Sequence, residues 1–123
     1  MVGEEGLVVT VEIDPVTFKY AKANLERAGY RDVLPVLADG GLGYPELQPY
    51  DRIAMTAACT EIPPPLLEQL AVGGRLIAPV IGAIGQDLTV FEKSAAGLSR
   101  KFISTVLYVN LRGQYGVPEE QES

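Results

Sequence analysis

The sequence predicts an α/β protein in which a parallel sheet is followed by an antiparallel hairpin. Over the first two-thirds of the chain, short β-branched apolar runs alternate with stretches of helical periodicity, which is typical of parallel strands joined by crossover helices. After Gly82 the pattern changes, and two apolar runs are separated only by the residues Ser-Ala-Ala-Gly. The chain has 123 residues, of which 47% are hydrophobic, so it is long enough for one modest domain with a core.

The first strand and helix have the clearest signals. Residues 7–13 form an apolar, β-branched run between Gly6 and Pro15, which favours a buried strand over a helix. Residues 15–28 have apolar side chains at helical spacing. Asp14 is expected to cap the start of this helix, Pro15 suits its first turn, and Gly29 is expected to end it.

The remaining elements follow in order. Residues 33–38 predict a second strand that ends at Asp39-Gly40, and Pro35 predicts that this strand lies at a sheet edge because proline donates no ladder hydrogen bond. Residues 40–50 predict a loop, residues 51–57 a third strand, and residues from about 60 to 70 a short helix. Gly73-Gly74 is expected to break that helix before a fourth strand at 75–81, and strands at 87–93 and about 99–111 form the hairpin. One domain is expected over residues 1–116, followed by a disordered acidic tail at 117–123.

Composition excludes several classes of function. The net charge is −6 and the ten basic residues are dispersed, so neither nucleic acid nor an anionic membrane is an expected partner. No apolar run is long enough to cross a bilayer, and no signal peptide is visible. The single cysteine excludes an internal disulfide and fits a reducing, cytoplasmic setting. With no histidine, the commonest general base and metal ligand is absent, and no metal site is expected.

Two acidic residues, Glu12 and Asp39, lie at the carboxyl ends of the first two predicted strands. Ligands of open α/β sheets bind beyond the carboxyl ends of the strands, where the carboxylate of Glu12 can accept hydrogen bonds from a ribose diol. Asp39 can accept from an adenine amino group, while Gly40 lets the backbone approach the ring. Each position also has a purely structural interpretation, because Glu12 can simply end a strand and Asp-Gly is a common turn.

Other polar or glycine-rich positions favour structural roles. Cys59 has no histidine to activate it and is interpreted as a small filler beside the third strand. Asp51 and Arg52 open a strand and are expected to face solvent or a loop. The glycines at 82–85 and 41–43 lack the Lys-Ser/Thr and the spacing of a phosphate loop, so both segments are interpreted as turns.

Taken together, these motifs resemble class I S-adenosylmethionine-dependent methyltransferases, and more narrowly the protein-L-isoaspartate O-methyltransferase family. The broader resemblance rests on Val-Thr-Val-Glu-Ile-Asp at 9–14, Tyr-Asp-Arg-Ile at 50–53 and Gly-Gly-Arg-Leu-Ile at 73–77. The narrower one rests on Ala-Asp-Gly at 38–40 followed by Leu-Gly-Tyr-Pro at 42–45, on residues 56–70 and on Val-Leu-Tyr-Val-Asn-Leu-Arg at 106–112. The resemblance extends from about residue 2 to 113.

The resemblance implies a role for each motif. Glu12 would bind the ribose hydroxyls of S-adenosylmethionine, and Asp39 with Gly40 would bind its adenine. The last strand would border the cleft for the isoaspartyl protein or peptide, with Val109 and Leu111 as substrate-binding positions. Asn110 stands where the family often has proline. No catalytic side chain is implied, because the attacking α-carboxylate is already ionised at neutral pH.

The resemblance also implies a Rossmann-like sheet in the order 3-2-1-4-5-7-6, of which this chain is the carboxy-terminal part without strand one. The family's first strand and glycine-rich turn have no counterpart, and residues 1–6 resemble the end of the helix after that turn. Strands two and four would then each have an unpaired edge, which proteins avoid. We therefore expect either a rearranged sheet or a second chain that covers these edges, most simply through a tight or swapped homodimer, or else that an N-terminal portion is missing.

Three functional hypotheses remain open from the sequence. The first is an S-adenosylmethionine-dependent methyltransferase that methylates L-isoaspartyl residues in damaged proteins, this chain being an incomplete and weakly active or inactive form. The second is a methyltransferase-like remnant that acts as an assembly or interaction module. The third is half of a nucleotide-binding oxidoreductase, which the hairpin arrangement around Gly-Gly-Arg-Leu-Ile disfavours.

Overall fold

The computed structural model describes residues 6–29 and 32–117, which form two compact units, one ending at Gly40 and the other beginning at Gly41. The boundary expected at residue 116 stays a prediction. Within the expected tail, Val117 donates its N–H to the carbonyl oxygen of Leu111 at 2.8 Å. The remainder of that tail, 118–123, lies outside the described residues, as does most of the segment 1–6.

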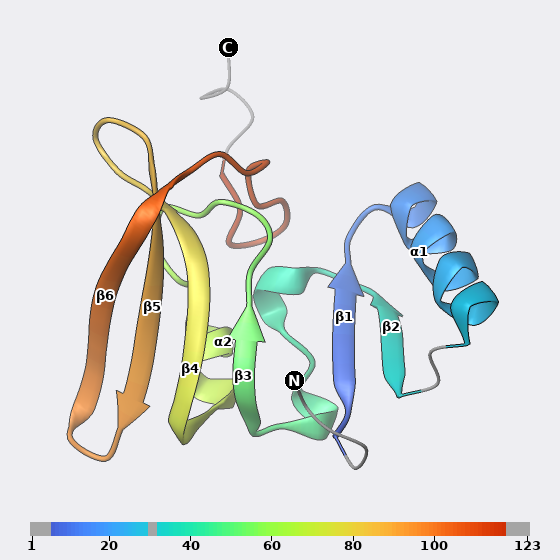
Figure 1. The fold of residues 1–123 in the computed structure, drawn as a ribbon, viewed down its shortest axis with the longest axis horizontal. Coiled ribbons are helices and arrows are strands. Elements are labelled where there is room, and N and C mark those ends of the chain that lie inside the picture. Colours follow the sequence, from blue (N-terminus) through green and yellow to red (C-terminus); the bar gives the residue numbers. More distant parts are fainter. Residues whose placement is uncertain (1–5, 30–31, 118–123) are drawn as a thin grey trace. The chain divides into compact units, whose positions relative to one another are not determined.

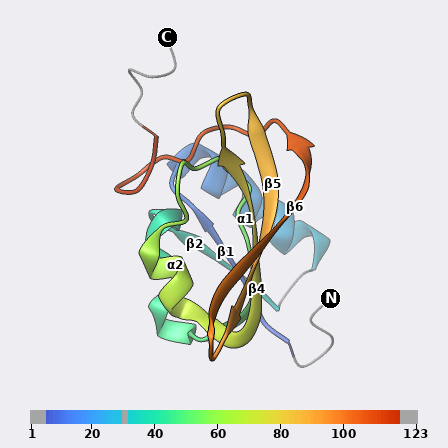
Figure 2. The ribbon, with the colours of Figure 1, turned by 90° about the vertical axis from the view of Figure 1, so that its left-hand side faces the viewer.

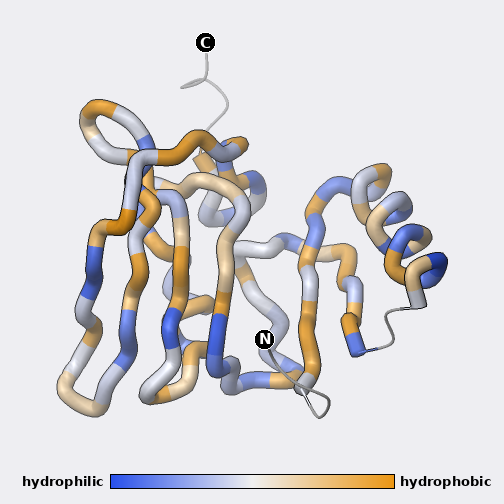
Figure 3. The backbone as a smooth tube through the Cα atoms, in the orientation of Figure 1, coloured by the Kyte–Doolittle hydropathy of each residue, from blue (hydrophilic) through white to orange (hydrophobic). Residues whose placement is uncertain are grey.

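The first unit is a strand–helix–strand motif. β1 (Val8–Glu12) pairs in parallel with β2 (Val33–Leu37), in a register that runs from Val8 opposite Val33 to Glu12 opposite Leu37 (Figure 1). The connecting helix is α1 (Pro15–Ala28), around which hydrophilic and hydrophobic positions alternate (Figure 3). The two predicted strands and the predicted helix are therefore confirmed, and β2 lies at a sheet edge as Pro35 requires.

The caps of α1 follow from its end residues. Asp14 accepts a hydrogen bond from the Thr17 N–H at 3.1 Å, which satisfies one of the donors that a helix start leaves without an intrahelical partner. Gly29 has φ of 80°, a left-handed conformation that glycine adopts without steric cost. Both cap assignments made from the sequence are confirmed.

The second unit is a four-stranded mixed sheet in the order β3-β4-β5-β6 (Figures 1 and 2). β3 (Tyr50–Ala54) runs parallel to β4 (Leu70–Ile81), β5 (Gln86–Ser94) is antiparallel to β4, and β6 (Gly97–Val106) is antiparallel to β5. The predicted hairpin is confirmed. Two 3₁₀ turns, Gly40–Leu42 and Pro45–Leu47, precede β3, and α2 (Pro64–Gln69) lies between β3 and β4 in the chain.

Several details differ from the sequence-based expectation, and the first is that β3 ends at Ala54 rather than at residue 57. The family order implied that the last strand lies between the two strands before it. In the structure β5 pairs directly with β4, and the last strand, β6, lies at the edge of the sheet. β4 begins at Leu70 rather than after Gly73-Gly74, since Leu70 is already opposite Tyr50 and the glycines lie in a register irregularity. β6 ends at Val106 rather than near residue 111, because β5 has no residue beyond Gln86 to pair with it.

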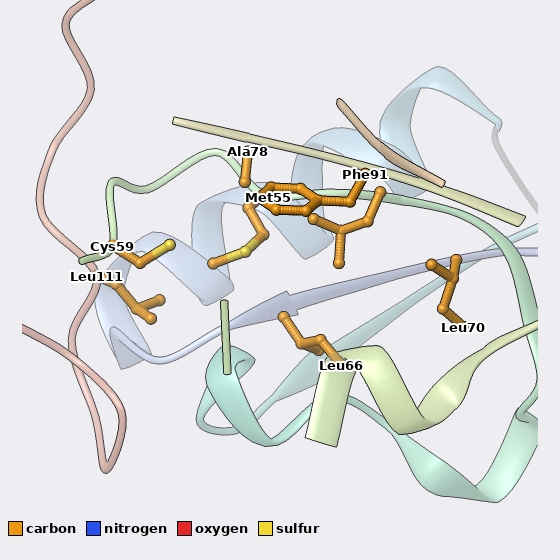
Figure 4. Close-up of a cluster of buried hydrophobic side chains, with 8 residues drawn as sticks. Met55, Cys59, Leu66, Leu70, Ala78, Phe91 and Leu111 are labelled. Atoms are coloured by element: carbon orange, nitrogen blue, oxygen red, sulfur yellow. The ribbon is translucent and has the colours of Figure 1, made fainter. Parts of the chain in front are cut away.

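The core lies in the second unit, between the sheet and α2 (Figure 4). Leu70 and Leu76 are almost completely buried, and each such leucine contributes about 1.5–3 kcal/mol relative to an exposed one. The lysine of β5, Lys93, donates from Nζ to the carbonyl oxygens of Leu67 and Leu70 at 2.8 and 2.9 Å. These bonds satisfy acceptors at the C-terminal end of α2 and fix that helix to the sheet. The buried cluster comprises Met55, Cys59, Leu66, Leu70, Leu76, Ala78, Phe91 and Leu111.

Candidate functional site

The predicted nucleoside-binding residues follow adjacent strand ends in the first unit. Glu12 is the last residue of β1 and lies opposite Leu37, and its carbonyl oxygen accepts from the Ala38 N–H at 3.0 Å. Asp39 and Gly40 come directly after Ala38. Because β1 and β2 are parallel, both acidic residues are at the carboxyl edge of this sheet, where ligands of such sheets bind.

The Glu12 carboxylate is fixed to the turn that leads into α1. Its Oε1 accepts a hydrogen bond from the Asp14 N–H at 3.0 Å. Asp14 in turn accepts from both the N–H and the hydroxyl of Thr17, at 3.1 and 2.6 Å. One oxygen of Glu12 is thereby oriented by the backbone, and Oε2 is the oxygen suited to a hydroxyl of a bound sugar.

Gly40 is a half-buried residue just after the end of β2. A Cβ atom at this position would meet the carbonyl oxygen of Val11 at 3.9 Å, which is an ordinary contact rather than a clash. The 3₁₀ turn Gly40–Leu42 begins here. The carboxylate oxygens of Glu12 and Asp39 are hydrogen-bond acceptors, which is the chemistry that the hydroxyl and amino donors of a nucleoside require.

Sequence reasoning missed Gln69, which organises the loop before β3. Gln69 is 5% exposed, and its Nε2 donates to the Leu42 carbonyl oxygen at 3.0 Å while its Oε1 accepts from the Tyr44 N–H at 3.0 Å. The Tyr50 hydroxyl donates to the carbonyl oxygen of Tyr44. Its position between the apolar residues Leu66 and Leu70 is the signal that it faces the core, but nothing local in the sequence names its hydrogen-bond partners.

The predicted substrate-binding residues lie on an extended segment after β6. Asn110 forms a parallel bridge with Ala58, the Ala58 N–H donates to the Val109 carbonyl oxygen at 2.6 Å, and the Leu111 N–H donates to the Ala58 carbonyl oxygen at 2.7 Å. The Val109 side chain is 76% exposed. The Leu111 side chain is 8% exposed and belongs to the buried cluster (Figure 4), so it holds the segment against the core, and its role in substrate binding stays a prediction.

Cys59 has the environment of a filler rather than a nucleophile. Its side chain is completely buried, and burial raises the pKa of its thiol to about 11. A thiol with that pKa is protonated at neutral pH and unreactive. The interpretation of Cys59 as a packing residue is confirmed.

Metal-binding clusters and membrane-spanning helices are both absent from the described residues. Across 6–29 and 32–117, the structure contains no group of three or more His, Cys, Asp or Glu side chains arranged to bind a metal ion. In the same part of the chain, neither helix has the length and apolar character needed to cross a membrane.

The family model and the curated relatives that match this chain all carry the same family description. Residues 1–116 match the family model described as protein-L-isoaspartate(D-aspartate) O-methyltransferase. A protein-L-isoaspartate O-methyltransferase of Methanococcoides burtonii is 46% identical over 117 residues, which are 94% of this chain and 57% of that protein. One from Korarchaeum cryptofilum is 47% identical over 114 residues, 90% of this chain and 52% of that protein. The chain spans about half the length of these curated relatives.

Solved structures have the same fold. A structure described as protein-L-isoaspartate O-methyltransferase superposes with a TM-score of 0.87 at 36% identity, covering 94% of this chain and 37% of that one. A Plasmodium falciparum protein described as a putative protein-L-isoaspartate O-methyltransferase in complex with S-adenosyl-L-homocysteine has a TM-score of 0.76. At 22% identity, this second likeness supports the fold alone. Both agree with a partial class I methyltransferase architecture.

Proposed function

The chain belongs to the protein-L-isoaspartate(D-aspartate) O-methyltransferase family, and we propose that it takes part in S-adenosylmethionine-dependent methylation of L-isoaspartyl residues in damaged proteins. The observation that carries this proposal is the match over residues 1–116, within which two acidic residues follow adjacent parallel strand ends. Because the chain spans about half of its curated relatives, we propose that it is weakly active or inactive alone.

We propose that Glu12, Asp39 and Gly40 bind the nucleoside part of the cofactor. Glu12 would accept from the ribose hydroxyls and Asp39 from the adenine amino group, while Gly40, which has no side chain, would lie beside the ring. The anchoring of Glu12 Oε1 by the Asp14 N–H favours this role, because a preoriented carboxylate loses little conformational freedom on binding. When bound, S-adenosylmethionine supplies an activated methyl group on a sulfonium.

The chain's own contribution to the transfer would be positioning. Val109 offers an exposed apolar surface beside which an isoaspartyl peptide would lie, and Leu111 anchors that segment in the core. The α-carboxylate of the substrate is ionised at neutral pH and needs no general base. Orientation and exclusion of water are then sufficient, in keeping with a chain that has no histidine and whose buried cysteine is protonated.

The two sheets suggest how a partner would complete the fold. β1 and β3 each lie at an edge of their own sheet among the described residues, so each has backbone groups available for pairing. We propose that a second copy of this chain, or a separate N-terminal portion, pairs with these edges. We further propose a cytoplasmic location, where damaged cytosolic proteins are the substrates.

Calorimetric titration with S-adenosylhomocysteine tests the proposed cofactor site. The wild-type chain is expected to release heat with saturable binding, and Glu12→Gln is expected to weaken that binding by about tenfold, the effect of one lost charge-assisted hydrogen bond. Methyl transfer to an isoaspartyl peptide, with and without an added N-terminal portion of a relative, tests the activity. A folded wild-type chain that gives no heat would refute the cofactor site.

The alternative that the chain acts as a non-catalytic assembly or interaction module is favoured by one observation. The chain spans about half the length of its relatives. In this alternative, the edges of β1 and β3 would serve association with a partner rather than catalysis. A stable complex between the chain and a partner that forms without cofactor binding would support this alternative.

A further inference from the structure

The side chain of Gln86 takes the place of a backbone partner for Tyr108. Its Oε1 accepts from the Tyr108 N–H at 2.7 Å, and its Nε2 donates to the Tyr108 carbonyl oxygen at 3.0 Å. Gln86 is 9% exposed and Tyr108 is 38% exposed, so both bonds are partly buried. One carboxamide thus pairs with both polar groups of a single backbone residue, as a neighbouring strand would.

The register of the sheet explains why a side chain is needed at this point. Gln86 is the first residue of β5, and its pairing with Val106 is the last between β5 and β6. The preceding residues form a tight turn in which the Gly82 N–H donates to the Gly85 carbonyl oxygen at 2.6 Å. From Leu107 onward β5 therefore offers no backbone for pairing, and the Gln86 side chain extends the pairing by one step.

The course of the chain after Tyr108 determines where the proposed peptide-binding surface at Val109 lies. The Leu107 and Val109 side chains are 91% and 76% exposed, whereas Leu111 is buried. Hydrogen bonds between Ala58 and Val109 and between Leu111 and Ala58 then join this segment to the residues after β3. Tyr108 is fixed between the end of the β5–β6 pairing and this second attachment.

We propose that Gln86 is a positioning residue that sets the path of residues 107–111, and thereby the rim on which an isoaspartyl peptide binds. The inference rests on the proposed function and adds to it a residue that contacts neither the peptide nor the cofactor. Because Gln86 belongs to the second unit and the proposed nucleoside site belongs to the first, its loss is expected to affect peptide binding and leave binding of S-adenosylhomocysteine unchanged.

The test compares Gln86→Leu with wild type and with Gln48→Leu. Leucine has a similar volume but forms no hydrogen bond, and the control makes the same change at an exposed glutamine before β3. Three quantities are measured on the whole chain: amide hydrogen exchange, the Kd of a fluorescently labelled isoaspartyl peptide, and the Kd of S-adenosylhomocysteine. The expected result for Gln86→Leu is faster exchange at Tyr108 and Leu111, a peptide Kd raised about tenfold, and an unchanged Kd for S-adenosylhomocysteine.

The possible outcomes separate the two proposals. Unchanged exchange at Tyr108 in Gln86→Leu would overturn the positioning role, as would faster exchange with an unchanged peptide Kd. Equal losses of peptide and S-adenosylhomocysteine binding would indicate general destabilisation and would also overturn it. If the wild-type chain binds neither ligand, the proposed function fails, while the exchange at Tyr108 and Leu111 still decides whether Gln86 sets the path of the segment.

Discussion

Replacement of Gln69 by leucine is the most direct test of how the loop before β3 is built. Gln69 is the last residue of α2 and its side chain is buried. It forms hydrogen bonds with the Leu42 carbonyl oxygen and the Tyr44 N–H, both at 3.0 Å. The predicted cost is the sum of two lost hydrogen bonds, each worth about 1 kcal/mol net, and of two partly buried backbone groups left without partners. Added apolar burial by leucine offsets about 1 kcal/mol. The free energy of unfolding is therefore expected to fall by about 2–3 kcal/mol.

Gly43 provides an independent check on the same contact. A Cβ at Gly43 would lie 2.1 Å from Gln69 Oε1, and the residue has φ of +68°, which a non-glycine residue rarely adopts. Gly43→Ala is therefore expected to displace the glutamine and lose much of the same stability. Because both changes remove one contact, the double variant is expected to cost less than the sum of the single variants.

Urea unfolding followed by far-ultraviolet circular dichroism measures these losses, and amide exchange at Tyr44 localises them. Gln48→Leu, at an exposed position on the same loop, is expected to change the unfolding free energy by less than about 0.5 kcal/mol. If Gln69→Leu falls within that same margin, or if exchange at Tyr44 is unchanged, the loop does not depend on Gln69 and the reasoning is wrong.

Three other predictions concern residues that hold the second unit together. Lys93→Met is expected to lower the unfolding free energy by about 1.5–3 kcal/mol, since two carbonyl oxygens at the end of α2 lose a charged donor, and urea titration would detect it. Leu76→Ala is expected to cost about 2–5 kcal/mol in the same assay, and a loss below 1 kcal/mol would contradict its place in the core. Burial raises the pKa of the Cys59 thiol from 9.0 to about 11, so its stabilising contribution is present below pH 9 and is lost as the pH rises towards 11. Unfolding free energies measured from pH 8 to 11 should fall accordingly, and thiol labelling at pH 8 should proceed no faster than unfolding.

The fold was predictable from the sequence wherever local chemistry decides the structure. Asp14 and Gly29 mark the two ends of α1, and each acts through side-chain or backbone properties that operate within a few residues. Glu12 and Asp39 were placed at one sheet edge because parallel strands necessarily end at the same edge. These parts of the site needed no knowledge of distant contacts, and their binding roles stay predictions.

The sequence was misleading where pairing between distant residues decides the structure. Gly73-Gly74 indicates a break, yet pairing of Leu70 with Tyr50 starts β4 ahead of the glycines. The apolar run through residue 111 indicates one long strand, yet β6 ends where β5 has no further residue and the side chain of Gln86 takes over. Buried glutamines such as Gln69 and Gln86 have no local signature that names their partners.

The nucleoside site is tested most directly by titrating ¹⁵N-labelled chain with S-adenosylhomocysteine and following backbone amide shifts. The Asp14 amide is the reporter for Glu12, because its N–H donates to Glu12 Oε1. We predict saturable shifts that are largest at Asp14, Asp39 and Gly40. Shifts that leave these three amides unmoved, at ligand concentrations that saturate other positions, would contradict the assignment of adenosine binding to this sheet edge.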